Sequence, residues 1–150
     1  MRIVEAGYAD DVVQRLVAQV QAEYVTRYGG PDGTPVDPDE FTPAAGGTFL
    51  VGLVEDEPVA CGGLRRHDPT SAEVKRMFVA AGHRGRGHAR EVLAALEDAA
   101  RGLGYARVIL ETGMAQPEAI ALYESSGYHR IPGFGYYRNS PLNRCYAREL

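Results

Sequence analysis

The stretch HRGRGHARE, residues 83–91, places three arginines and two glycines directly before a long segment with helical periodicity. That segment, residues 89–104, carries its apolar residues on one stripe, and Gly104 is placed to end a helix. The preceding run AEVKRMFV, residues 72–79, has the composition of a strand. Residues 72–104 therefore predict a strand, a glycine-rich loop and a helix in succession.

Composition predicts one cytoplasmic domain over residues 1–150. A chain of 150 residues with 45% hydrophobic content can bury one sizeable core. The charged, alternating start and the lack of an apolar run of about 20 residues predict no signal peptide and no membrane span. A net charge of -4 argues against non-specific nucleic-acid binding. Cys61 and Cys145 are isolated in sequence, which predicts reduced, buried thiols and no metal site.

Outside the central unit, periodicity predicts helices alternating with short strands. The helix over residues 8–30 begins at an Asp10 cap and ends at Gly29, and the helix over residues 116–128 has Pro117 in its first turn and Gly127 at its end. Further strands are expected at residues 2–6, 47–54, 57–66, 106–113, 128–131 and 144–150, and an irregular excursion at residues 30–43. This order predicts an α+β or mixed-sheet protein whose helices cover the sheet faces.

The loop before residue 89 has the properties of a phosphate site. A helix start leaves about four backbone N–H groups without internal partners and carries a partial positive charge. Gly85 and Gly87 allow close approach of the backbone, and the arginines add charge-assisted contacts. No Gly-Lys-Ser/Thr follows, and Arg90 interrupts the dinucleotide pattern. The alternative is a flexible connection with solvated arginines.

These residues resemble a known family. Arg84-Gly85-Arg86-Gly87-His88-Ala89 fits the Arg/Gln-x-x-Gly-x-Gly/Ala signature of the GNAT (GCN5-related N-acetyltransferase) family, in the family's position between the fourth strand and the next helix. The resemblance extends across nearly the whole chain. Residues 72–112 look like the family's central strand, loop, helix and strand, and residues 116–128 look like its next helix, with the ending A-x-x-L-Y-x-x-x-G-Y. It implies a small single-domain member of bacterial type. The expected fold is a mixed, mostly antiparallel sheet of six to seven strands, with a splay between strands four and five.

The resemblance also implies acetyl-CoA as cosubstrate and no metal. The amides of Arg84, Gly85, Arg86, Gly87, His88 and Ala89 would hold the pyrophosphate, with Arg84 adding charge. Met77, Phe78 and Val79 would bond the pantetheine arm like an added strand, and N–H near Val79 would stabilise the developing oxyanion. Gln116 stands where many members have an asparagine that contacts the cofactor.

Two residues are candidates for proton transfer. Tyr123 matches the family's frequent general acid for the departing sulfur, although its apolar helical face also suits a core position. Glu73 lies six residues before Val79, at the offset of the glutamate base in the histone-acetylating branch, and is expected to share a strand face with Lys75 and Met77. The alternatives for Glu73 are a solvated partner of Lys75 or Arg76, with ordered water acting as the base.

The resemblance implies that the acceptor pocket is built by the segment after the first helix and by the loop between the last two strands, here residues 29–43 and 132–143. These loops supply acids and aromatic rings, which suit a cationic small-molecule amine with an apolar body. An alternative is that the acids solubilise one loop and the rings close the end of the sheet. The residues are Asp32, Asp37, Asp39, Glu40, Phe134, Tyr136 and Tyr137.

Three functions are compatible with these observations. The first is acetyl-CoA-dependent N-acetylation of a primary amine of a small molecule by direct attack on the thioester. The second is a non-catalytic acyl-CoA-binding or sensing module, and the third is a scaffold whose arginines face a protein partner. No nucleic-acid or membrane partner is expected, and a homodimer through residues 144–150 is possible on the family's pattern.

Overall fold

A computed structural model describes residues 1–150 and contains one seven-stranded sheet in the order β1-β2-β3-β4-β5-β7-β6. Only the β4–β5 pair is parallel, so the predicted mixed, mostly antiparallel sheet is confirmed. None of the helices is long and apolar enough to cross a membrane. The elements are β1 Arg2–Glu5, α1 Asp11–Tyr28, η1 Pro38–Phe41, η2 Pro43–Ala45, β2 Thr48–Val54, β3 Glu57–Asp68, β4 Ser71–Val79, η3 Ala81–His83, α2 His88–Gly102, β5 Arg107–Gly113, α3 Pro117–Ser125, β6 His129–Ile131 and β7 Asn143–Glu149.

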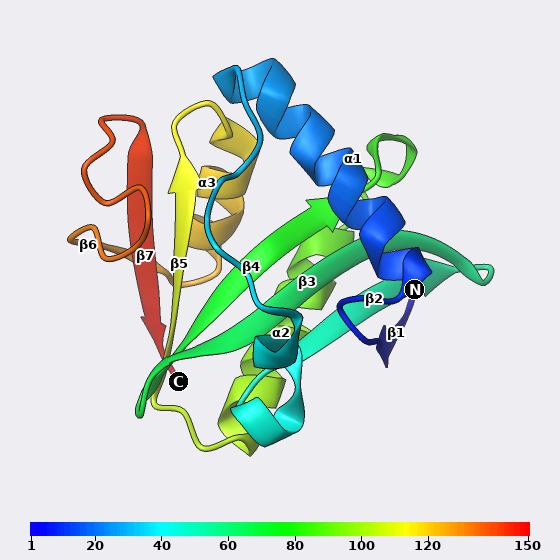
Figure 1. Ribbon diagram of the computed structural model, residues 1–150, viewed down its shortest axis with the longest axis horizontal. Helices are drawn as coiled ribbons and strands as arrows, with labels where there is room; N and C mark the ends of the chain where they lie inside the picture. Colours follow the sequence, from blue (N-terminus) through cyan, green and yellow to red (C-terminus); the bar gives the residue numbers. More distant parts are fainter.

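Helices cover both faces of the sheet, as predicted. On one face α1 and η1 pack over a cluster that includes Leu16, Phe41 and Phe49. On the other face α2 and α3 pack over a larger cluster that includes Leu96 and Tyr123. Figure 1 shows α1 crossing the near side of the sheet and α2 lying behind it. The two faces therefore carry separate hydrophobic cores.

Most element ends lie where local sequence signals predict them. Asp10 is the N-cap residue of α1, and Gly29 ends that helix in the left-handed region with φ 81°. Glu55 and Asp56 both have positive φ in the β2–β3 connection, which matches the twist of a two-residue hairpin turn. Both cysteines are buried and free. Burial raises the pKa of the Cys61 thiol to about 12, so this thiol is unreactive.

The strands β4 and β5 separate along their length, which confirms the predicted splay. Their pairing joins residues 71–74 to residues 107–110 and ends there. Beyond this point β4 continues to Val79 and β5 continues to Gly113 without pairing to each other. Figure 1 shows the two arrows diverging toward their tips. Two strand edges therefore face an opening between them.

A β-bulge in β4 changes which face each side chain meets. Lys75 pairs with Gly63 and Phe78 with Cys61, so two residues of β4 lie opposite one residue of β3. Arg76 takes up the extra length with φ 59°. Met77 consequently packs into the cluster under α2. The prediction that Met77 shares a face with Glu73 and Lys75 is wrong, because strict alternation does not survive a bulge.

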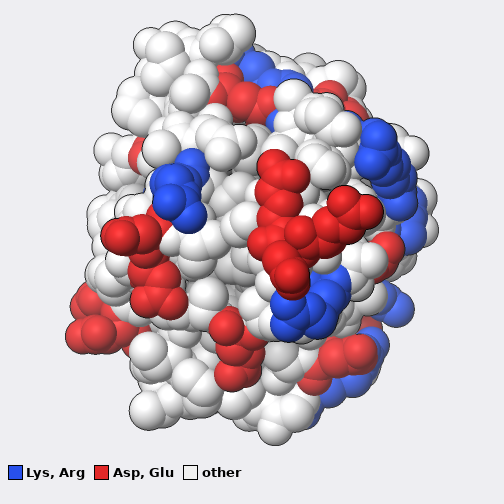
Figure 2. All heavy atoms as spheres, turned by 90° about the vertical axis from the view of Figure 1, so that its right-hand side faces the viewer, with Lys and Arg blue, Asp and Glu red and all other residues white.

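Acidic side chains predominate on the surface beside β1, in agreement with the net charge of -4. Figure 2 shows acidic groups across the centre of this face and basic groups set among them and toward one side. Arg2 of β1 and Asp56 form an exposed ion pair at 3.0 Å. Exposed pairs of this kind contribute about 0 to 1 kcal/mol.

The close packing of β3 gives a test of the fold. A Cβ on Gly63 would lie 2.7 Å from Phe41 Cε1 and 2.8 Å from Phe49 Cδ2. We expect Gly63→Ala to lower the free energy of unfolding by about 1–3 kcal/mol through overpacking. Gly102→Ala, in the last turn of α2 with no atom within 4 Å of the new Cβ, is the control. It should raise that free energy by up to about 1 kcal/mol. Urea unfolding measures both, and an unchanged value for Gly63→Ala would contradict the packing.

Candidate functional site

Two cavities meet at the opening between β4 and β5. The first, here called the loop cavity, has a volume of about 620 Å³ and is lined by the end of β4, the 83–90 loop and α3. The second, here called the tyrosine cavity, has a volume of about 300 Å³ and lies between α1, β5 and residues 137–143. Six residues line both cavities: Tyr24, Asp32, Lys75, Glu111, Thr112 and Gln116. The two cavities thus share one wall at the splay.

The backbone amides of residues 84–90 donate no hydrogen bond within the protein. The first backbone bond at the start of α2 runs from Glu91 N–H to Gly87 O, at 3.1 Å. Gly85 and Gly87 have φ 77° and 82°, and the space beside each Cα is open. Free amides at a helix start, next to open space, form an anion site. The predicted position of the phosphate-binding loop therefore fits a diphosphate group.

The three arginines of this loop differ in their surroundings. Arg84 Nε donates to Val79 O at 2.8 Å, and its guanidinium pairs with Glu23 of α1 and lies 5.6 Å from the centre of the Phe78 ring. The charge predicted to act on the cofactor is thus already paired, and this role of Arg84 stays a prediction. Arg90 donates to the hydroxyls of Ser125, the last residue of α3, and of Ser126, the residue that follows it. Arg86 is exposed and leaves its charge available.

The end of β4 turns backbone groups toward the opening. Met77, Phe78 and Val79 line the loop cavity. Ala80 N–H donates to Val59 O at 2.8 Å, and in an antiparallel pair the next residue points its N–H and C=O the other way. The backbone groups of Val79 therefore face the gap between β4 and β5. Gln116 lines both cavities, and its Nε2 donates to the Tyr28 hydroxyl at 3.1 Å.

Tyr123 combines the two properties proposed for it from the sequence. The residue is 5% exposed, and its ring packs near those of Tyr128 and Tyr146. It also lines the loop cavity, and its hydroxyl makes no hydrogen bond to another protein group. Burial raises the pKa of this hydroxyl above its ordinary value. The phenol therefore keeps its proton at neutral pH and has it free to donate.

Glu73 lies away from both cavities. It is 4% exposed, its Oε1 accepts a hydrogen bond from Arg65 Nε at 3.0 Å, and it pairs with Ile109 in the closed part of the β4–β5 ladder. The alternative of a solvated partner for Lys75 or Arg76 is wrong, because Glu73 is buried and its ion partner is Arg65. Its role as a base stays a prediction.

Two of the seven residues predicted for the acceptor site line the tyrosine cavity, namely Asp32 and Tyr137. The other acids serve the 37–42 turn: Asp37 and Glu40 form its capping box, and Glu40 also contacts Arg65. Phe134 packs edge-on against His67, and Tyr136 is exposed. The excursion at residues 30–43 therefore contributes one charged side chain to the cavity.

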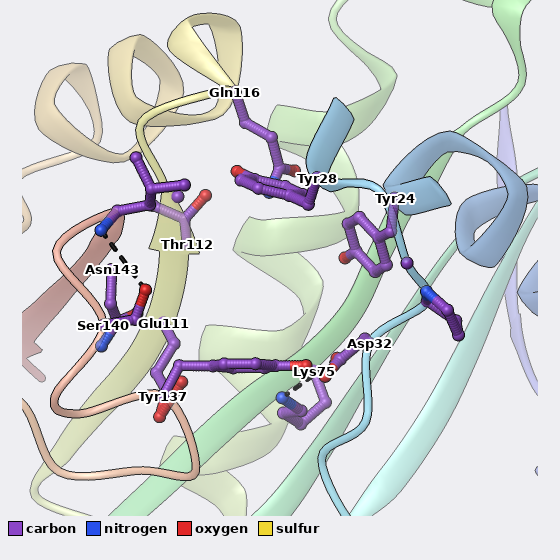
Figure 3. Close-up of a pocket in the computed structure, with 14 residues that line it drawn as sticks. Tyr24, Tyr28, Asp32, Lys75, Glu111, Thr112, Gln116, Tyr137, Ser140 and Asn143 are labelled. Carbon is purple, nitrogen blue, oxygen red and sulfur yellow. Dashed lines mark hydrogen bonds and ion pairs between the residues drawn. The ribbon is translucent and has the colours of Figure 1, made fainter. Parts of the chain in front are cut away.

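The polar residues of the tyrosine cavity that sequence reasoning missed include two tyrosines, a lysine and a glutamate. Tyr24 and Tyr28 are four residues apart at the end of α1, so they share a helix face. Lys75 comes from β4 and Glu111 from β5, at the start of the splay. Figure 3 shows these side chains lying around one space. The available signals were the pair of tyrosines and the single charged residue that ends the apolar run of β5.

The two carboxyl groups of this cavity have opposite electrostatic states. Burial acts to raise the pKa of Asp32, but the charge of Lys75, the hydrogen bond from the Thr34 amide and the charge of Arg76 together lower it. Burial raises the pKa of Glu111, Lys75 opposes this, and the charge of Glu73 adds to it. Asp32 is therefore firmly ionised and paired, whereas Glu111 holds its charge less strongly.

Comparison with known proteins agrees with this geometry. The model of the acetyltransferase (GNAT) family matches residues 17–128. An IAA acetyltransferase of Azospirillum brasilense is 38% identical over 103 residues, which are 68% of this chain and 67% of that protein. The uncharacterised N-acetyltransferase YsnE of Bacillus subtilis is 38% identical over 105 residues, which are 69% of this chain and 70% of that protein.

Solved structures share the fold over nearly the whole chain. A protein of Klebsiella pneumoniae described as an acyl-CoA N-acyltransferase superposes with a TM-score of 0.84 at 29% identity, covering 99% of this chain and 97% of that one. A GNAT acetyltransferase of Elizabethkingia anophelis, solved with acetyl-CoA bound, has a TM-score of 0.71 at 16% identity and covers 99% and 97%. The matched residues include β4, the glycine loop, α2 and α3, and the chain belongs to the GNAT family of acetyltransferases.

Proposed function

We propose that this chain transfers the acetyl group of acetyl-CoA to a primary amine of a small molecule by direct attack on the thioester. The observation that carries the proposal is the set of free amides at residues 84–90, beside the opening between β4 and β5. Family membership supplies acetyl transfer as the type of reaction. Acetyl-CoA is bound in a neighbour of the same fold, which supports its choice as cosubstrate.

The loop cavity has the parts that acetyl-CoA needs. The amides of residues 84–90 would hold the pyrophosphate, and the exposed Arg86 would add charge. The part of the β4 backbone that faces the gap, at Val79 and at alternate residues before it, would bond the pantetheine arm along the strand edge. The C=O of Val79 already accepts from Arg84 Nε. The bound thioester supplies the activated acyl group.

The reaction then needs an oxyanion donor, an acid and an entry for the amine. The N–H of Val79 points into the gap and can donate to the oxygen that gains charge. Tyr123 would give its proton to the departing sulfur. The amine would enter through the tyrosine cavity, which meets the loop cavity at the splay and so brings nucleophile and thioester together.

Two measurements test the proposal. Calorimetry with CoA should show binding, and acetyl-CoA with a panel of small amines should release free CoA thiol. Binding of CoA without thiol release from any amine would favour the non-catalytic acyl-CoA module. Absence of binding at millimolar CoA would overturn the proposal and favour the third function, a scaffold whose arginines face a protein partner.

The glycine loop gives a matched pair of variants. Gly87 and Gly104 have φ 82° and 88°, and open space lies beside both, so alanine costs similar strain of about 1–2 kcal/mol at each. Only Gly87 lies in the proposed phosphate loop. We expect Gly87→Ala to weaken CoA binding at least about tenfold, because a Cβ obstructs the anion. Gly104→Ala should lose stability alone, and equal CoA affinities in the two variants would contradict the loop assignment.

Tyr123→Phe tests the proposed acid. We expect kcat to fall about 100-fold while CoA affinity stays within about twofold, because only the transferable proton is lost. Tyr128→Phe is the control, since its hydroxyl donates to Glu97 at 2.8 Å and it lines neither cavity. That variant should lose stability and keep kcat. An unchanged kcat in Tyr123→Phe would show that Tyr123 is not the acid and serves only in packing.

Glu73→Gln tests the predicted base. If Glu73 accepts the amine proton, directly or through ordered water, turnover falls, CoA affinity holds and the acidic limb of the kcat/KM profile against pH changes. Glu40→Gln is the matched control, because Glu40 contacts the same Arg65 side chain at 3.4 Å. An unchanged pH profile in Glu73→Gln, with lowered stability, would assign Glu73 to the ion pair alone.

A further inference from the structure

Lys75 presents an ammonium group without hydrogen-bond partners to the tyrosine cavity. It is the only lysine in the chain, it is 8% exposed, and its ammonium makes no hydrogen bond to the protein. Its one ion pair is to Asp32 Oδ2, at a distance of 3.7 Å. A buried charged group normally has several hydrogen-bond partners, because burial removes its water. The ammonium of Lys75 therefore has donors to spare.

Asp32 does not meet that need, because other groups already use its oxygens. Its Oδ2 pairs with Arg76, and its Oδ1 accepts from the amide of Thr34 at 2.9 Å. These contacts hold the 30–37 segment against the bulge of β4. Asp32 is thus a structural partner of Arg76, and its contact with Lys75 is an ion pair without a hydrogen bond.

Glu111 presents the complementary negative charge. It is the first residue of β5 beyond Leu110, where the pairing of β5 with β4 ends, and it lines both cavities. Its Oε2 is shielded from solvent and accepts no hydrogen bond from the protein. The backbone N–H of Tyr137 acts on the same carboxylate and lowers its pKa. Burial raises the pKa of this carboxyl, and the charge of Lys75 opposes that rise. A ligand that donates hydrogen bonds would complete its surroundings.

Lys75 and Glu111 face the same space without joining each other. The ion pair of Lys75 is to Asp32, and no ion pair within 4.0 Å includes Glu111. Figure 3 shows both side chains in the lower part of the tyrosine cavity, close to Tyr137. Two opposite charges, both short of partners and both at the junction of the cavities, match a ligand that carries both signs.

We propose that the tyrosine cavity binds a zwitterionic amino acid as the acetyl acceptor. Glu111 binds its amino group at the splay, and Lys75 binds its carboxylate. Tyr24, Tyr28 and Tyr137 enclose its side chain. This assignment rests on the proposed function, because the bound amine must reach the thioester in the loop cavity.

A ligand with only an amine or only a carboxylate would leave either Lys75 or Glu111 without an oppositely charged partner. An amine without a carboxylate would satisfy Glu111 and place its positive charge near the Lys75 ammonium. A carboxylic acid without an amine would satisfy Lys75 and offer no nucleophile. A volume of about 300 Å³ also suits a small ligand such as a free amino acid. The charges of Lys75 and Glu111 therefore favour a small molecule that carries both an amine and a carboxylate.

The test compares acceptors that differ only in the carboxylate. Thiol release from acetyl-CoA is measured with the common amino acids, each beside its primary carboxamide. For the best amino acid, the decarboxylated amine is added as a third acceptor. We expect kcat/KM of the amino acid to exceed that of its carboxamide by about tenfold or more, since the carboxamide leaves the buried ammonium without its charged partner. Carboxamides that match or exceed every amino acid would overturn the inference.

Two variants separate the two ends of the acceptor. Lys75→Met should bring the ratio of amino acid to carboxamide to within about threefold, and Lys75→Arg should restore part of the preference. Glu111→Gln should raise KM for both acceptors and leave their ratio unchanged, because both carry the amine. Glu149→Gln, an exposed position on β7, is the matched control and should change neither quantity. An unchanged ratio in Lys75→Met contradicts the carboxylate assignment.

The same measurements distinguish the inference from the function on which it rests. CoA binding, measured by calorimetry, shows that each variant is folded. The comparison of amino acids with their carboxamides uses the unsubstituted protein and does not depend on any variant. Efficient acetylation of amines that lack a carboxylate would leave the proposed function standing and overturn the amino-acid assignment. Absence of thiol release with every amine, together with absence of CoA binding, would overturn both.

Discussion

The parting of β4 and β5 is the constraint on which the rest of the molecule depends. Backbone N–H and C=O groups that lose a ladder partner must find another partner or face solvent or a ligand. Because pairing ends at Val74 and Leu110, both strand edges beyond these residues face an opening. The two cavities meet at that opening. With a fully paired β4–β5 ladder, the free amides at the start of α2 would have no reactive chamber beside them.

Contacts from α1 and the segment after it hold the opening in shape. Arg27 donates to Ala115 O at 2.8 Å and pairs with Glu118 of α3 at 2.5 Å. Glu23, one turn earlier, pairs with Arg84 of the glycine loop, and Asp32 pairs with Arg76 at the bulge. The end of α1 and the segment after it thus contact the glycine loop, the bulge of β4 and α3. These partners lie far apart in sequence, so the site forms only when the whole sheet is assembled.

Local signals in the sequence account for most of the fold but for only part of the site. The caps of α1, the β2–β3 turn and the glycine loop depend on residues a few positions apart, and periodicity reveals them. The bulge at Arg76 has no such signal, because a positive φ at an arginine arises from its partners across the sheet. Strict alternation consequently placed Met77 on the wrong face. The free state of the loop amides was predictable, since it follows from the helix start itself.

The acids show why the acceptor side was harder to predict than the cofactor side. Counting acids in the 30–43 loop found Asp32, which its partners make a structural residue, whereas Glu111 appeared only as the polar end of an apolar strand. What separates them is the number of donors around each carboxylate, and the donors to Asp32 come from β4 and the 30–37 segment together. A phosphate cradle needs one helix start and its loop. An acceptor site needs a balance of charges across the whole sheet, and in this balance Lys75 and Glu111 are the two groups that the protein itself leaves without a close partner.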